Sequence, residues 1–155
     1  MNATHLHLML THFPLVGLGF ALMINLYANF RKNPEIRKLS LWIYVMVGVT
    51  SLLAYFTGDG AEEVIKTYPG ITEDMIEPHE HFALVFFIGI MVISCLSVFG
   101  LYYSTKKESF LKKINLYTVI LAVILCIFAV ETAITGGNIR HSEIKNGSYK
   151  ELKSK

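Results

Sequence analysis

Four long apolar runs constrain the fold of this chain more than any other feature of its sequence. A helix needs roughly 20 apolar residues to cross the hydrocarbon core of a bilayer. None of the four runs contains Lys or Arg, and only the last contains an acidic residue, Glu131. The runs are His12 to Phe30, Leu39 to Thr57, Phe82 to Tyr103 and Leu116 to Thr135. The sequence therefore predicts an all-α integral membrane protein, an antiparallel bundle of four helices.

The composition supports a membrane protein with a single domain. The chain has 155 residues, of which 53% are hydrophobic and 17% charged, whereas a soluble domain carries about 25% charged residues. Four spans use most of this length. We expect residues 1–145 to form one four-helix transmembrane domain and residues 146–155 to be a disordered, lysine-rich tail.

The charges in the connections between the runs predict the topology. The connections 31–38 and 104–113 each carry four basic residues against one glutamate, whereas Lys66 is the only basic residue in the acidic connection 58–80. Cytoplasmic connections are enriched in Lys and Arg. Both termini and the acidic connection are therefore predicted to lie outside. The basic tail opposes this assignment, but the two connections agree with each other.

The acidic connection is predicted to form a short helical lid over the outer end of the bundle. Gly58 and Gly60 are expected to end the second span, and residues 61–68 to form a short amphipathic helix. Residues 72–76 are expected to form another, and Pro78 suits the first position of the third span.

Pro14 leaves two possible starts for the first helix. Thr11 could cap a helix that begins at His12, which places the proline in the first turn. Alternatively, the helix begins near Thr4 and bends at Pro14. Both versions place His12 at the outer rim of the bundle.

All six histidines are predicted to lie on the outer side of the membrane. Imidazole is a common ligand for haem iron, copper and zinc. Two helical histidines that face each other across a bundle can hold a haem b through both axial positions. We expect His12 and His79 as the first axial pair and His7 and His141 as a second, with Arg140 beside a haem propionate.

Other interpretations of the histidines remain open. A copper, iron or zinc ion would need three or four nitrogen or oxygen ligands, and Glu62, Glu63, Glu80 and Glu143 lie in the same connections as the histidines. A histidine near a membrane interface can also be a simple amphipathic end-group. Glu131 is expected to accept a hydrogen bond from the ring of a ligand histidine, or to be a neutral acid paired with a neighbouring helix.

The cysteines carry no clear chemistry. Cys95 and Cys126 both fall near the middle of their spans, which favours packing over a disulfide, and no Cys-x-x-Cys-His run attaches a haem covalently. No residue is assigned a catalytic role, so enzymatic activity is left undecided.

Four stretches of the chain resemble a family of bacterial predicted membrane proteins that is classed as a domain of unknown function. The first is His7-Leu8-Met9-Leu10-Thr11-His12-Phe13-Pro14, and the second is residues 57–64. The third leads from Pro69 to Glu80, and the fourth is Gly136-Gly137-Asn138-Ile139-Arg140-His141-Ser142-Glu143-Ile144. The resemblance implies four spans and favours His7, His12, His79 and His141 over His5 and His81. A proline that usually follows the first histidine is Leu8 in this chain.

The resulting hypothesis is an electron-transfer protein of the bacterial inner (cytoplasmic) membrane. Its expected partners are the lipid bilayer and a redox partner or a larger respiratory-type membrane complex. A non-catalytic assembly subunit of such a complex is a further alternative. Nucleic-acid binding has no support, because the basic connections are explained by topology.

Overall fold

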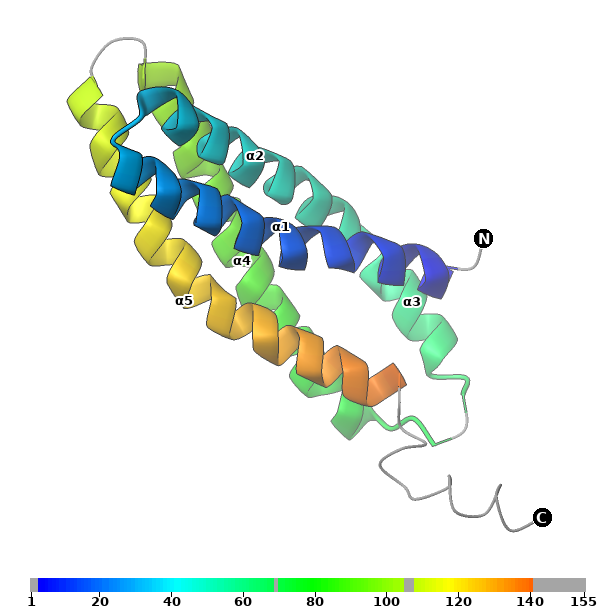
Figure 1. Ribbon diagram of the computed structural model, residues 1–155. Coiled ribbons are helices and arrows are strands. Elements are labelled where there is room, and N and C mark those ends of the chain that lie inside the picture. The colour runs from blue at the N-terminus through cyan, green and yellow to red at the C-terminus, as the bar shows by residue number, and fades with distance from the viewer. Residues whose placement is uncertain (1–2, 69, 105–107, 141–155) are drawn as a thin grey trace.

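The computed structural model describes residues 3–68, 70–104 and 108–140. These residues form the helices α1 (Ala3–Arg31), α2 (Pro34–Phe56), α3 (Gly58–Ile65), α4 (Glu73–Ser104) and α5 (Glu108–Arg140). The four long helices form an antiparallel bundle, and the short α3 follows α2 and packs against α1 (Figure 1). All four are long and apolar enough to cross a membrane. The predicted all-α four-helix membrane bundle is therefore confirmed.

The outside of the bundle is more apolar than parts of its interior. Large side chains such as Phe20, Trp42, Ile88 and Ile127 are exposed along the four helices. Several buried side chains are polar instead, and these are Asn25, Arg37, Ser40, Ser51, Ser97, Asn115 and Thr118. Lipid provides the apolar environment around the bundle. Small and hydrogen-bonding residues inside the bundle can therefore help to hold the helices together. This distribution fits a multi-pass membrane protein.

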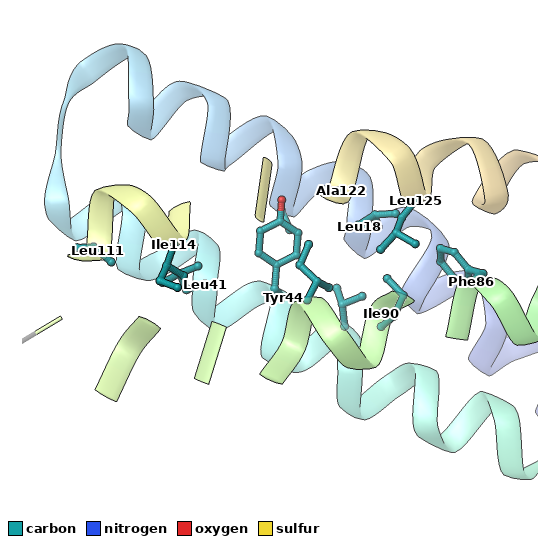
Figure 2. Packing of buried hydrophobic residues seen from close by; sticks show 12 residues of the cluster. Leu18, Leu41, Tyr44, Phe86, Ile90, Leu111, Ile114, Ala122 and Leu125 are labelled. Carbon is teal, nitrogen blue, oxygen red and sulfur yellow. The ribbon is translucent and has the colours of Figure 1, made fainter. Parts of the chain in front are cut away.

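The apolar core runs along the axis of the bundle. Tyr44 lies near its middle, between Leu41 and Ile114 towards one end and Ile90 and Phe86 towards the other (Figure 2). These side chains are almost fully buried. The core therefore links all four long helices and fixes their relative positions.

The two long hairpins, α1–α2 and α4–α5, repeat one pattern of buried positions. In α1 the buried residues are Pro14, Leu18, Ala21, Asn25 and Ala28, and at the same spacing in α4 they are Phe86, Ile90, Ile93, Ser97 and Gly100. In α2, Arg37, Ser40, Tyr44 and Val47 are buried, and their counterparts in α5 are Asn115, Thr118, Ala122 and Leu125. The helices pack in the cyclic order α1, α2, α4, α5. The two hairpins are therefore approximate repeats of each other, although α2 packs more closely against α4 than α1 packs against α5.

Close helix contacts follow the same repeat. A Cβ atom added at Gly17 would lie 2.8 Å from Cγ2 of Val47, and one added at Gly89 would lie 2.1 Å from Cδ2 of Leu125. Gly17 and Gly89 occupy equivalent positions in the two hairpins, as do Val47 and Leu125. Each hairpin is thus closed by a glycine against a branched aliphatic side chain.

The first hairpin turns in a short connection. Asn33 caps α2 with its side-chain oxygen, which accepts hydrogen bonds from the backbone N–H groups of Glu35 (2.9 Å) and Ile36 (3.2 Å). Pro34 follows as the first helical residue, where its missing N–H is not needed. The basic connection is therefore a tight turn that directs α2 back along α1.

Two expected helix boundaries differ from the structure, and one that was left open is now decided. α1 begins before His12 and runs through Pro14, so the version with the early start is the correct one. α4 begins at Glu73 and runs through Pro78, so the second short helix of the expected lid is part of α4. α5 continues as a helix through Gly136 and Gly137 to Arg140. In each case apolar packing and continuous backbone hydrogen bonding override a local helix-breaking signal.

Candidate functional site

His7 connects the start of α1 to the end of α2. Its Nδ1 atom lies 3.1 Å from the backbone oxygen of Ala54 and 3.2 Å from Oγ1 of Thr57. The Thr57 hydroxyl in turn donates a 2.8 Å hydrogen bond to the Ala54 oxygen. The half-buried ring is therefore held by two acceptors that belong to one turn of helix.

His79 has the same environment in the second hairpin. Its Nδ1 atom lies 3.2 Å from the backbone oxygen of Thr132 and 3.2 Å from Oγ1 of Thr135. The Thr135 hydroxyl donates to the backbone oxygens of Glu131 (2.8 Å) and Thr132 (3.2 Å). His79 is the counterpart of His7 in the repeat, and Thr135 is the counterpart of Thr57.

These contacts determine which ring nitrogen carries the proton. A backbone carbonyl can only accept a hydrogen bond, so Nδ1 of each histidine must be the donor. In the neutral ring Nε2 then has a free lone pair. A histidine whose N–H is fixed by a carbonyl is the usual form of a metal-ligating imidazole. His7 and His79 thus have the same hydrogen bonding at Nδ1, which leaves the Nε2 lone pair of each ring free of these contacts.

A glycine beside each ring leaves room for it. Gly58 follows Thr57, and a Cβ atom added there would lie 3.7 Å from Cε1 of His7. Gly136 follows Thr135, and a Cβ atom added there would lie 3.0 Å from Cε1 of His79 and 3.3 Å from its Nδ1. The first distance is an ordinary contact, whereas the second requires the ring to move. Gly136 is therefore needed for the observed position of His79.

The two rings belong to diagonal helices of the bundle. Both lie at the end of the bundle where α1 and α4 begin. At this end α1 and α5 diverge, whereas they lie close together near the other end (Figure 1). The repeat therefore places two equivalent imidazoles on diagonal helices at the same end of the bundle.

Acidic residues surround this end of the molecule. The carboxyl groups of Glu62 on α3 and Glu80 on α4 are within hydrogen-bonding reach of each other. Lys66 forms ion pairs with Glu62 (2.6 Å) and Glu73 (2.8 Å), which link the end of α3 to the start of α4. These two carboxylates hold the pKa of Lys66 above its usual value. Ion pairs within the acidic connection thus join α3 to the start of α4, at the end of the bundle that holds the histidines.

The other predicted site residues are not part of this arrangement. His12 is exposed, and its Nδ1 faces the Leu8 oxygen of its own helix. His5 and His81 are also exposed. Within the described residues, no histidine ring donates to Glu131, because carbonyl and threonine oxygens take that role. The structure therefore gives His7 and His79 matching contacts and leaves His12 exposed.

Three predicted residues cannot be placed at the site. His141 and Glu143 lie outside the described residues, and Arg140 is described only as the last residue of α5. In the ranges that the structure does describe, no three His, Cys, Asp or Glu side chains are grouped so as to hold a metal ion.

Thr57, Thr135 and Gly136 were missed by the sequence analysis as site residues. Their signal is present in the sequence as a repeat. The second and fourth runs each end in a threonine that is followed by a glycine, and His7 lies as far before Gly17 as His79 lies before Gly89. Comparing the two halves of the chain with each other would have found them.

Comparisons with known proteins add no assignment. No protein-family model matches the chain, and searches of curated proteins and of solved structures also find no match. The resemblance to the bacterial membrane-protein family therefore stays a prediction.

Proposed function

We propose that the protein is a membrane electron-transfer protein that binds haem b between His7 and His79. The carrying observation is the matched pair of hydrogen bonds that fixes a proton on Nδ1 of each ring and leaves each Nε2 available. Two neutral imidazoles on opposite helices are the ligand set that a six-coordinate haem takes in a helix bundle.

The residues around the rings fit such a group. Thr57 and Thr135 orient the imidazoles, and Gly136 leaves space beside one of them. When bound between two histidines, haem supplies reversible one-electron transfer at its iron. The chain's own contribution is to hold both rings in fixed orientation and to keep their Nδ1 protons in place, so that little rearrangement accompanies a change of charge.

The setting in the membrane is part of the proposal. The basic connections favour the cytoplasmic side, which places the histidines near the outer face and makes α3 a lid over them. The bacterial inner membrane and the family resemblance are carried by the sequence patterns alone. An electron donor or acceptor would be another component of the same membrane, such as a respiratory-type complex.

The optical spectrum of the detergent-purified full chain tests the proposal. We expect a reduced-minus-oxidised spectrum of a six-coordinate b-type haem, with about one haem for each chain, the stoichiometry of a single bis-histidine site. Iron, copper and zinc should be measured on the same sample. A preparation that was grown with sufficient haem and iron, yet has no haem bands, would rule the proposal out. Stoichiometric copper or zinc in that preparation would favour the non-haem alternative instead.

A further inference from the structure

The end of the bundle opposite the histidines holds a buried cation that lacks a partner. Arg37, in the first turns of α2, is only 4% exposed. Its Nε and Nη1 atoms are buried and have no hydrogen-bond partner among the described residues. Leaving a buried donor unpaired destabilises a protein, and leaving a buried charge unpaired does so more strongly. Such a group in a natural protein calls for an acceptor that the described residues do not provide.

Asn115 adds a further donor beside Arg37. It is the counterpart of Arg37 in the repeat, it is fully buried, and its Nδ2 atom has no partner in the part of the chain that the structure describes. The Ser40 hydroxyl contacts both residues. It donates a hydrogen bond to the backbone oxygen of Arg37 (2.8 Å) and lies 3.4 Å from Oδ1 of Asn115. Two buried side chains with unpartnered donors therefore lie at this end of the bundle, as two equivalent imidazoles lie at the other.

The charges around this pair favour an anion. The positive charge of Arg37 influences the carboxyl group of Glu108. Glu108 is exposed, however, and already forms a 2.9 Å ion pair with Lys112. The exposed basic residues at the same end are Arg31, Lys32, Lys112 and Lys113.

The surroundings also favour a ligand that is partly apolar. Leu41, Leu111 and Ile114 pack at this end of the core (Figure 2). The planar guanidinium of arginine binds phosphate through two parallel hydrogen bonds. We propose that Arg37 and Asn115 form a binding site for a phosphate group at the basic end of the bundle. The group could belong to the head of an anionic phospholipid or to free phosphate.

Ligand-dependent thermal unfolding tests this site on the full-length protein in detergent. The unfolding midpoint would be followed by circular dichroism with added phosphatidylglycerol, with phosphatidylcholine, and with inorganic phosphate against chloride at equal ionic strength. A rise with phosphatidylglycerol alone identifies an anionic lipid head. A rise with both lipids identifies the phosphodiester of any phospholipid, and a rise with inorganic phosphate identifies the free ion. Native mass spectrometry of the wild-type protein should also show retained phospholipid in the first two cases.

Variants separate the site from general charge. Arg37→Met should abolish the midpoint rise and weaken binding about tenfold to a hundredfold, as expected for loss of a hydrogen-bonded charge. Arg37→Lys keeps the charge but loses the paired donors, so it should give a reduced rise. Lys38→Met removes a neighbouring cation that pairs with Glu35 at 2.8 Å and should respond like the wild type. The proposal fails if no probe raises the wild-type midpoint, or if Arg37→Met responds as the wild type does.

Discussion

The two hairpins of the bundle agree in their site residues and differ in their core residues. His7, Thr57 and Gly58 of the first hairpin reappear unchanged as His79, Thr135 and Gly136 of the second. At equivalent buried core positions the two hairpins instead carry different side chains. These differing pairs are Leu18 and Ile90, Ala21 and Ile93, Asn25 and Ser97, and Tyr44 and Ala122.

This difference shows which positions depend on chemistry and which depend on volume. A core accepts different side chains when the total volume and the pattern of burial are kept. The large Tyr44 in one hairpin and the small Ala122 in the other are an exchange of this kind. A ligand-holding imidazole has no substitute of equal volume, because its two nitrogens must both be used. The two halves are identical at the proposed ligand positions, and also at Gly17 and Gly89, where the helices pack closely.

The largest expected effect is the loss of either ring of the pair. His7→Ala and His79→Ala should each remove one axial ligand. We expect haem occupancy to fall by at least about tenfold in both variants. Even the loss of a residue that only orients a metal ligand lowers metal affinity by about 10- to 100-fold. The optical spectrum and the haem content of each purified variant measure this effect.

Two exposed histidines provide the matched controls for that experiment. His12→Ala and His81→Ala should leave the spectrum unchanged, because both side chains lie on the surface. If His79→Ala eliminated the haem while His7→Ala left it intact, the two hairpins would not share one site. A strong effect of His12→Ala would restore the pairing of His12 with His79.

The two glycines beside the rings should give unequal effects. Gly136→Ala puts a methyl group 3.0 Å from the His79 ring, whereas Gly58→Ala puts one 3.7 Å from the His7 ring. We expect Gly136→Ala to weaken haem binding by about 10-fold or more, in the range of changes that misorient a ligand. Gly58→Ala should stay within about twofold, as an ordinary contact implies. Haem titration of the apoprotein compares them, and equal effects would show that the hairpins hold their rings with equal clearance.

The fold was easier to predict from the sequence than the site. Four apolar runs were enough to predict an antiparallel bundle, because a membrane requires helices of that length. The matching contacts of His7 and His79 were not predictable in the same way, since those of His7 depend on α1 starting before His12 and running through Pro14. That early start places His7 beside Ala54 and Thr57, and single-residue patterns do not contain this register.

The helix-packing glycines should distinguish the two hairpins in stability. Gly89→Ala would bring a methyl group within 3.4 Å of three atoms of Leu125, so the whole side chain must move. Overpacking of this kind costs about 1–3 kcal/mol. Gly17→Ala meets a single methyl of Val47, at 2.8 Å. Its strain is offset by the roughly 1 kcal/mol by which alanine exceeds glycine in helix propensity. Unfolding in detergent, followed by circular dichroism, should show a clear loss for Gly89→Ala and little change for Gly17→Ala.

The smallest expected effect comes from the two threonines. Thr57→Val and Thr135→Val each remove one of the two acceptors of a ring N–H and leave the backbone oxygen, at 3.1 Å for His7 and 3.2 Å for His79. A net hydrogen bond contributes about 0.5–1.5 kcal/mol, so haem affinity should fall only by a few-fold in either variant. Because the backbone contact of His79 is the longer of the two, Thr135→Val should be at least as damaging as Thr57→Val. Haem titration and the midpoint potential measure both. A large loss in Thr57→Val alone would mean that the Ala54 oxygen does not hold His7 by itself, and that the matched hydrogen bonds of the two hairpins are unequal in strength.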